Sequence, residues 1–464
     1  MSQSVILWLR RDLRLADNPA LDAALADGVV IPVFILDDDT AGDRKMGGAS
    51  RWWLHHSLSA LDVALREKGS RLIVRRGNAL SVLTALAHQT GAERIHANRH
   101  FEPWWKSTES ELAQEIDLVL HDGNQLARPE DILTGSGGRY RMFTPWWRAL
   151  VARMPPRKPI VTPATITAPS DWPQSDRLED LALLPTKPDW ATGFDIWHPG
   201  EAGAQAALKS FLPDITAYDE RRNLPSQRGT SRLSPHLHFG EISPATIWHH
   251  AARAASKDAE PYLREIGWRD FATNLIDQFP DYGWVNGKAG FDAMPWRTGA
   301  DADRDFTAWT KGQTGYPVVD AGMRELWATG VVHNRVRMIV ASFLIKHLLI
   351  DWRRGERWFW DTLVDADYAS NASNWQWVAG TGVDAPLFSR IMAPLSQSEK
   401  FDAAGYIAKW VPELAKLSAP HIHDPDEYGM RPSNYLAKII GHREARERAL
   451  AALQQARAAT LRDE

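Results

Sequence analysis

Short β-branched runs alternate with helical stretches over residues 1–130 of the chain. The runs have the length and residue types of strands, and the stretches between them repeat apolar residues at helical spacing. Strand–helix alternation is typical of a doubly wound parallel sheet. We therefore predict strands at Val5–Leu9, Val29–Leu36, Arg71–Val74, Arg94–Ala97 and Leu118–His121, and helices at Ala20–Leu25, Ser50–Glu67, Leu80–His88 and Trp104–Glu115.

The pattern changes twice after this region. From Pro155 to Pro199 the chain is rich in Pro, Thr, Ser and Asp with little periodicity, which indicates a long connector packed on the surface. After Glu201 the pattern is almost wholly helical and ends in a helix over His442–Asp463. A chain of 464 residues is too long for one ordinary core. We predict an α/β domain over residues 1–130, a connector over 131–200 and an all-helical domain over 201–464.

Composition narrows the classes of function. Hydrophobic residues make up 44% of the chain and charged residues 24%, which is usual for a soluble protein. No apolar run is long enough for a membrane span, and the N-terminus reads as a first strand rather than a signal peptide, so we expect a cytoplasmic protein. The net charge of −4 means that binding of nucleic acid would require a local basic patch.

The chain has 22 Trp and no Cys. The absence of Cys excludes a disulfide, a thiolate nucleophile and a Cys-ligated metal, and we expect no metal. Tryptophan stacks on bases and flavins and is readily oxidised by one electron. The combination favours aromatic or redox chemistry on a bound organic cofactor.

Two segments could contact a nucleotide. Arg228–Ser234 reads RGTSRLS, and its hydroxyls and backbone N–H groups could cradle a diphosphate, although an ordinary helix start has the same residues. Glu265, Trp268 and Arg269 share one helical face. That face could hydrogen-bond a base, stack on it and hold its phosphate, or it could be a salt-bridged helix with one half-buried Trp.

His333–Met338 begins a long helix that places Asn334, Arg337 and Met338 on one face. An apolar run follows Arg337, so its guanidinium lies near the buried side and needs a carboxylate. Asp365 or Asp367 can supply that carboxylate, in a structural or a functional ion pair.

Trp375 and Trp377 are about 200° apart around a helix, and Asn371 shares the side of Trp375. One side of this helix could therefore face a cofactor while the other meets a substrate. Two core tryptophans between packed helices would give the same spacing.

Taken in order, these segments resemble the DNA photolyase/cryptochrome family. The resemblance runs from LWLRRDLRLADNPAL near the N-terminus to WVPEL at 410–414, and it is strongest in GTSRLS, GYPVVDAGMREL, HNRVRM, DWRRGE and NWQW. It implies an N-terminal α/β antenna-type domain and a helical domain that holds FAD. It also implies light-driven repair of cyclobutane pyrimidine dimers by electron transfer from reduced, anionic FAD, as in a class I photolyase.

The resemblance also assigns roles by position. The residues that match FAD contacts are Tyr218, Thr230, Ser231, Leu233, Ser234, Arg337, Asp365, Asp367 and Asn371, of which Asn371 matches the amide that faces flavin N5. Those that match the substrate cavity and its rim are Glu265, Trp268, Asn334, Met338, Trp377 and Arg390. The electron-transfer chain is matched by Trp296, Trp352 and Trp375, and the candidate phosphate contacts are Arg269, Arg335 and Arg390.

Two segments depart from the family pattern. A folate antenna in this family uses a Glu and a Lys, whereas this chain has Trp105 and Gly283 near those positions. The departure argues against folate and leaves a deazaflavin, another flavin or no antenna open. The segment APLFSRIMAP (385–394) keeps Arg390 in register but predicts a reshaped cavity rim.

Three alternatives share some of these features. A cryptochrome photoreceptor often has Asp or Cys in place of Asn371, and a (6-4) photolyase has His in place of Met338. A light-independent flavoprotein would need no aromatic cavity, so Trp268 and Trp377 would be core residues. We expect a monomeric photolyase whose partner is UV-damaged DNA, with no membrane association.

Overall fold

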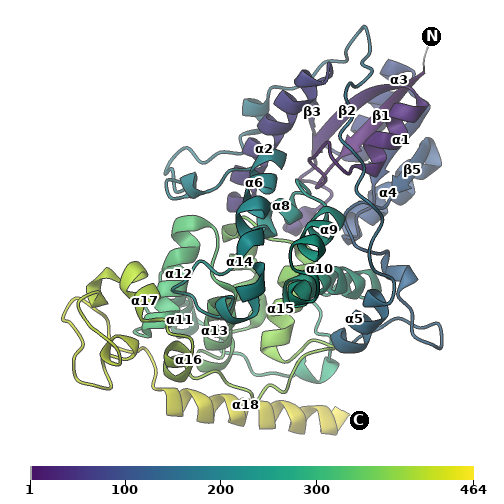
Figure 1. The fold of residues 1–464 in the computed structure, drawn as a ribbon. Coiled ribbons are helices and arrows are strands. Elements are labelled where there is room, and N and C mark those ends of the chain that lie inside the picture. The colour runs from purple at the N-terminus through teal and green to yellow at the C-terminus, as the bar shows by residue number, and fades with distance from the viewer. Residues whose placement is uncertain (1–2, 464) are drawn as a thin grey trace.

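The protein has a five-stranded sheet with flanking helices at one end and a larger helical part at the other (Figure 1). A computed structural model describes residues 3–463. The strands are all parallel, in the order β3-β2-β1-β4-β5. The predicted fold class, a doubly wound α/β domain followed by a helical domain, is confirmed. The strand bounds are β1 (Ser4–Leu9), β2 (Val29–Leu36), β3 (Ile73–Arg76), β4 (Arg94–Asn98) and β5 (Asp117–His121).

Strand β3 begins two residues later than the sequence pattern predicts. Pairing with β2 starts where Ile73 lies opposite Val33. Before that point, the backbone N–H of Leu72 donates to the Asp62 side chain at 2.8 Å, and Arg71 lies over the ring of Trp172. These local contacts hold residues 71–72 out of the ladder.

Helices cover both faces of the sheet and bury two apolar clusters against it. The first helix begins at Pro19 because the Asn18 side chain accepts from the backbone N–H of Leu21 at 3.2 Å. The helices of this part are α1 (Pro19–Asp27), α2 (Gly48–Glu67), α3 (Ala79–Thr90) and α4 (Pro103–Glu115), with a short turn of helix, η1, at Gly42–Arg44.

The connector contributes to both cores, so the expectation of a connector packed only on the surface is incomplete. Ile166, Phe194 and Trp197 are buried with the residues of the sheet part. Helix α5 (Phe143–Val151) instead places Phe143 and Trp146 in a core of the helical part. Composition did not reveal Ile166, Phe194 and Trp197 because they are single apolar residues in a polar, Pro-rich segment. The predicted domain bounds remain predictions.

After β5 the described chain forms no further strand beyond one isolated bridge between Leu133 and Arg139. No helix over residues 3–463 is long and apolar enough to cross a membrane. The helices of this part are α6 (Glu201–Phe211), α7 (Tyr218–Arg221), α8 (Ser234–His238), α9 (Pro244–Ala255), α10 (Glu260–Gln278), α11 (Ala300–Thr310), α12 (Pro317–Thr329), α13 (Asn334–Ser342), η8 (Phe343–His347), α14 (Trp352–Thr362), α15 (Tyr368–Ala379), α16 (Pro394–Lys400), α17 (Ala404–Trp410) and α18 (His442–Asp463).

Candidate functional site

The loop before α8 leaves hydrogen-bond donors unused. Within residues 3–463, the backbone N–H groups of Thr230, Ser231 and Arg232 have no acceptor. Arg232 has a φ of 55°, which bends the backbone there. The Ser231 hydroxyl accepts from the Tyr262 hydroxyl at 3.2 Å, which fixes its position. Free N–H groups on a bent loop suit a phosphate, so the segment fits the diphosphate of a nucleotide cofactor.

The carboxylate that the sequence predicts for Arg337 is that of Asp365. The Arg337 Nη2 atom lies 3.0 and 2.9 Å from the two carboxylate oxygens of Asp365, and Nε donates to the Val332 carbonyl at 2.8 Å. The Asp365 side chain is 5% exposed and that of Arg337 is 26% exposed. The guanidinium is therefore held in place from α13 but keeps an open edge for a ligand.

Asp367, the other candidate partner of Arg337, contacts a different set of groups. It caps α15 by accepting from the backbone N–H of Ser370 at 2.8 Å, and it faces His238 and Arg11 at 3.9 and 3.8 Å. Burial raises the pKa of Asp367, but His238 and Arg11 outweigh this effect, so the pKa lies below its usual range. The carboxylate is ionised and fixes the start of the helix that carries Asn371.

Helix α15 has one side buried in the core and the other partly open. The ring of Trp375 packs edge-on against Phe359 at 5.0 Å, whereas Trp377 is only half-buried. Asn371 is buried, and its Nδ2 atom donates to the carboxylate of Glu356 at 2.9 Å and to the Glu356 main-chain carbonyl at 3.1 Å. In the described structure its amide oxygen has no donor, so this oxygen is available to a ligand.

Glu265 and Trp268 of α10 both have a partner already. Arg222 binds the Glu265 carboxylate at 2.5 Å. Trp268 stacks on Phe143 with a centroid distance of 3.5 Å and an interplanar angle of 7°. One face of the indole is thus covered, and only the opposite face remains for a stacked base.

Arg269 does not share this setting. Its guanidinium donates to the Asn124 carbonyl at 2.5 Å and lies next to Asp270. The side chain is 18% exposed and lines a polar cavity between the two parts of the molecule, together with His100. This position differs from the exposed phosphate contact that the sequence suggests.

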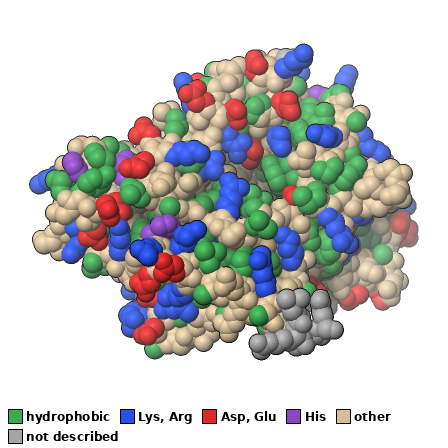
Figure 2. Space-filling view, turned by 90° about the horizontal axis from the view of Figure 1, so that it is seen from below, with side chains coloured by type: hydrophobic (Ala, Val, Ile, Leu, Met, Phe, Trp, Pro, Cys, Tyr) green, Lys and Arg blue, Asp and Glu red, His purple; other side chains and the backbone are tan. Residues whose placement is uncertain are grey.

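Cations gather near Met338 instead. Arg335 donates to Asn223 at 2.5 Å, lies 4.4 Å from the ring centre of Phe401, and contacts the Met338 sulfur at 3.7 Å. Burial, followed by Arg222 and the exposed Arg390, lowers the pKa of Arg335. Figure 2 shows Lys and Arg side chains spread across the middle of one face, with hydrophobic side chains between them. Asn334 is exposed beside this group.

Sequence reasoning missed four residues that hydrogen-bond to the predicted site residues: Arg222, Asn223, Lys346 and Glu356. Arg222 and Asn223 follow the matched Tyr218 by four and five residues, so that match could have drawn attention to them. Lys346 lies in an apolar run, and its ammonium donates to the Arg390 carbonyl at 2.8 Å. Glu356 ends the DWRRGE segment of the family resemblance, so that segment could have drawn attention to it, but its partner Arg44 comes from a distant segment.

The three tryptophans assigned to electron transfer belong to one apolar cluster. Trp375 and Trp352 are buried in it, and Trp296 packs against it. The Trp352 Nε1 atom donates to Asn286 at 3.0 Å. Within the described chain, none of the three rings is in stacking or edge contact with another. They share a core without forming a continuous stack.

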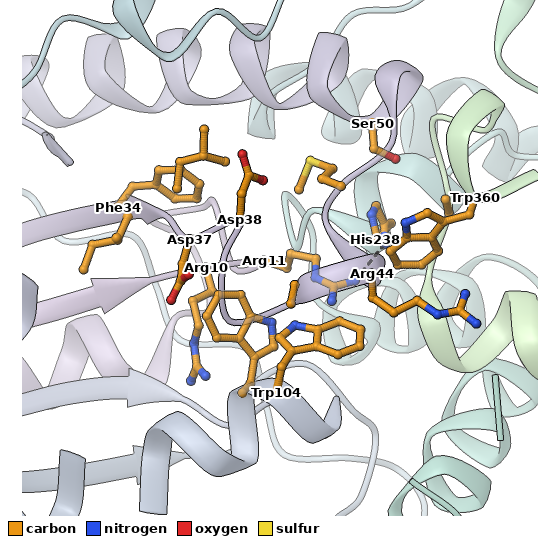
Figure 3. Close-up of a pocket in the computed structure, with 16 residues that line it drawn as sticks. Arg10, Arg11, Phe34, Asp37, Asp38, Arg44, Ser50, Trp104, His238 and Trp360 are labelled. Carbon is orange, nitrogen blue, oxygen red and sulfur yellow. Dashed lines mark hydrogen bonds between the residues drawn. The ribbon is translucent and has the colours of Figure 1, made fainter. Parts of the chain in front are cut away.

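A second cavity site lies where the sheet part meets the helical part (Figure 3). Loops after β1 and β2 supply Arg11 and Asp38, α4 supplies Trp104 and Trp105, and α14 supplies Trp360. The carboxyl ends of parallel strands at a reversal of strand order commonly form such crevices. The Trp105 Nε1 atom is buried and has no acceptor among the described residues. An aromatic, polar-edged crevice with an unused donor fits a planar organic ligand.

Comparisons with known proteins agree with this layout. A family model described as "DNA photolyase" matches residues 5–164, and one described as "FAD binding domain of DNA photolyase" matches residues 262–455. A deoxyribodipyrimidine photo-lyase of Agrobacterium fabrum is 49% identical over 97% of each chain. Cryptochrome-2 of Arabidopsis thaliana is 34% identical, over 99% of this chain and 80% of its own.

Solved structures show the same arrangement. A class III photolyase from Agrobacterium tumefaciens superposes with a TM-score of 0.93 at 48% identity, covering 99% of this chain and 98% of its own. An archaeal photolyase from Sulfolobus tokodaii, described with two FAD molecules, gives a TM-score of 0.83 at 31% identity, covering 97% and 100%.

Proposed function

The chain belongs to the DNA photolyase/cryptochrome family, and from that premise we propose that it is a light-driven enzyme that splits cyclobutane pyrimidine dimers in DNA. The observation that carries the proposal is the setting of Asn371, whose amide hydrogens are both used by Glu356 while its oxygen stays free. Such an oxygen accepts from an N–H group, and the N5–H of reduced flavin is the group that a photolyase must keep protonated and close.

FAD fits the residues of the helical part. The free N–H groups of residues 230–232 would hold its diphosphate, and Arg337, anchored by Asp365, would face its ring system. When bound, FAD supplies light absorption and the transferred electron. Tyr218 and Leu233 are buried under the same loop and pack in one apolar cluster, which keeps the loop in shape.

Substrate recognition would use the side of Trp268, Trp377 and Met338. A damaged base pair costs less to extrude from the duplex, and one free indole face can receive the extruded base. His333 caps the helix that carries Met338, and burial lowers its pKa to about 4, so it is neutral at neutral pH. Since Met338 does not titrate and His333 is neutral, electron transfer to a cyclobutane dimer is favoured over the proton-assisted repair of a (6-4) lesion.

DNA phosphates would contact Arg335 and Arg390, because within residues 3–463 neither guanidinium group has a carboxylate oxygen within 4.0 Å. Arg269 is left out of this set because its guanidinium is committed to Asn124 and Asp270. We propose further that the protein acts as a monomer.

The similarity at 48% identity to a structure described as a class III photolyase favours that class over class I, which the sequence resemblance suggested. The crevice with Trp105 is the candidate site for a second, light-harvesting chromophore. Mass spectrometry of small molecules released from the purified protein would identify it. Release of FAD alone from wild-type protein would reject an antenna at this site.

One experiment separates the proposed function from its alternatives. Illumination with a reductant should bleach the flavin absorbance, and the protein should then restore an oligonucleotide that carries a thymine dimer. A cryptochrome would bleach without repair, a (6-4) photolyase would restore only the (6-4) lesion, and a light-independent flavoprotein would do neither.

The tryptophan route has its own test. Trp352→Phe or Trp296→Phe removes an indole that can be oxidised, so flavin photoreduction should slow at least several-fold. Repair by chemically reduced enzyme should stay near the wild-type level, because the route is used only to load the electron. Unchanged photoreduction in Trp352→Phe would remove this residue from the route.

A further inference from the structure

One arginine of the sheet part reaches into the core of the helical part. Arg44, at the end of η1, is 5% exposed, and its Nη1 atom lies 2.7 and 2.8 Å from the two carboxylate oxygens of Glu356. Its Nη2 atom donates to the Gly283 carbonyl at 2.7 Å. Figure 3 shows its guanidinium turned away from Asp38 and toward the helical part. Three aromatic rings surround it at 5.2 to 5.9 Å, those of Trp284, Trp360 and Tyr368.

Glu356 connects this arginine to Asn371. Its side chain is 0% exposed, so every contact it makes is with protein. A carboxylate can only accept hydrogen bonds, so it binds the NH2 end of the Asn371 amide, at 2.9 Å. A protonated carboxyl could donate instead and would bind the amide oxygen. The Glu356 main-chain carbonyl also accepts from the NH2 group, at 3.1 Å, so the ionised side chain and the main chain favour the same amide orientation, whereas a protonated side chain would oppose it.

We propose that Arg44 is a positioning residue: it keeps Glu356 ionised and so holds the Asn371 amide with its oxygen toward the flavin. The inference rests on the proposed function, since only there does Asn371 face FAD. It extends that function by giving the α/β part a role in tuning the flavin that does not depend on an antenna.

The electrostatics support this role. Burial raises the pKa of Glu356, and Arg44 opposes that rise, first by its charge and then by its hydrogen bonds. The other cation that faces Glu356 is Arg357 on its own helix, and the titratable neighbour on α15 is Tyr368, whose pKa burial raises to a value far above neutrality. The pKa of Glu356 stays above its ordinary value, and Arg44 is the group that opposes protonation of this carboxyl most strongly, so loss of Arg44 should favour the protonated form.

The consequence is a shift in flavin redox balance. Reduced flavin carries a hydrogen on N5 and is stabilised by a facing oxygen. Oxidised flavin has a bare N5 and is stabilised by a facing NH2 group. Arg44 should therefore raise the midpoint potential of bound FAD, although it lies outside the flavin-contacting segments.

The experiment compares Arg44→Met with Arg357→Met. Arg357 pairs with Asp43 and so links the same two elements, α14 and η1, at the surface. Two quantities are measured: the midpoint potential of bound FAD, and the infrared C=O band of a protonated carboxyl in the protein as purified. Arg44→Met should lower the potential and show a new carboxyl band, which disappears in Arg44→Met/Glu356→Gln. Arg357→Met should match wild type in both.

Two further variants test the order of events. Glu356→Gln presents an NH2 group to the Asn371 oxygen, so it should lower the potential as Arg44→Met does, and the double variant should lower it no further. Arg44→Lys keeps the charge but loses the second nitrogen, which binds the Gly283 carbonyl, and it should show no carboxyl band.

Several results would overturn the proposal. They are a wild-type potential in Glu356→Gln, a carboxyl band missing from Arg44→Met, or an equal potential shift in Arg357→Met. If Arg44→Met does not fold, the Glu356→Gln potential and the Arg44→Lys band decide. If the wild-type protein binds no FAD, the proposed function fails, while the infrared band still tests whether Arg44 keeps Glu356 ionised.

Discussion

Basic side chains near the sheet have carboxylate partners, whereas several basic side chains near Met338 have none. On the side that faces the sheet, each of three arginines contacts a buried carboxylate; the pairs are Arg10 with Glu109, Arg11 with Glu102, and Arg44 with Glu356. On the side of Met338, three cations have no carboxylate within 4.0 Å among the described residues: Arg335, Lys346 and Arg390.

The difference separates architecture from ligand binding. A buried charge without a partner is costly, so the paired arginines are accounted for by packing, within the sheet part for Arg10 and Arg11 and between the two parts for Arg44. Lys346 is buried and donates to the Arg390 carbonyl, so only Arg335 and Arg390 can meet an anion from outside the chain. Under the proposed function, that anion would be a DNA phosphate. The net charge of −4 hides this side because carboxylates elsewhere outnumber it.

Breaking a pair on the sheet side should have the largest effect. Arg44→Met leaves Glu356 buried without its cation, and the free energy of unfolding should fall by about 3–5 kcal/mol. Arg357→Met breaks an ion pair whose side chains are 57% and 87% exposed, so the loss should stay below about 1 kcal/mol. Chemical denaturation of wild type, Arg44→Met and Arg357→Met measures both losses of unfolding free energy. Equal losses would mean that the buried pair is not a structural anchor.

Removing the exposed stacking surface should weaken substrate binding. Trp268→Ala should cost about 1–3 kcal/mol of affinity for an oligonucleotide with a cyclobutane dimer, the usual size of one base–aromatic stack. Trp327→Ala is a matched control, because Trp327 is also partly exposed and stacks on another ring, that of Trp358. Affinity unchanged in Trp268→Ala would remove this residue from the site.

Glu265→Ala should instead lower the repair yield per absorbed photon, with FAD retained and affinity little changed. Its carboxylate is held by Arg222 and can hydrogen-bond the base that gains charge. Quantum yield and binding, measured on the same preparations, separate the two effects. A large loss of affinity in Glu265→Ala would contradict a role confined to the reacting base.

The pH dependence of stability tests whether Lys346 is a buried cation without a carboxylate partner. Burial lowers its pKa to about 7 from an ordinary value of 10.5, so between these values the folded state binds fewer protons than the unfolded state. Its contribution to the free energy of unfolding therefore rises with pH over that window, by at most about 1.4 kcal/mol per unit. Lys346→Met should remove this rise. Burial also lowers the pKa of Lys288, but that side chain is less buried, so Lys288→Met should change the profile less than Lys346→Met does. Parallel pH profiles of wild type and Lys346→Met would contradict an unpaired, buried lysine.

The same contrast explains what could be predicted from the sequence. Strands and helices follow local periodicity, so every strand of the sheet was predicted, and only β3 differs by more than one residue at an end, where Asp62 and Trp172 bind its first residues. Arg337 could be matched to a carboxylate because Asp365 is one of only two candidates in a recognisable segment.

Contacts between distant segments could not be recognised in the sequence. Arg44 and Glu356 are 312 residues apart, and neither lies in a motif that names the other. Arg269 shares a helical face with Glu265 by spacing, yet the packing of the sheet part draws its guanidinium to Asn124. Helical periodicity gives the face of a side chain, and only the tertiary fold gives its partner.

The smallest effect is expected in the salt dependence of DNA binding, where the contrast is sharpest. Each phosphate contact releases counterions and adds about 0.9 to the slope of log K against log salt. Arg335→Met and Arg390→Met should each reduce that slope by about 1, for damaged and undamaged duplexes alike, because phosphates carry no sequence information. Arg269→Met should leave it unchanged, since its guanidinium is already bound within the protein. Binding constants measured over a several-fold range of salt decide this. A slope that falls only in Arg269→Met would restore the assignment made from the sequence and place the DNA on the other side of α10.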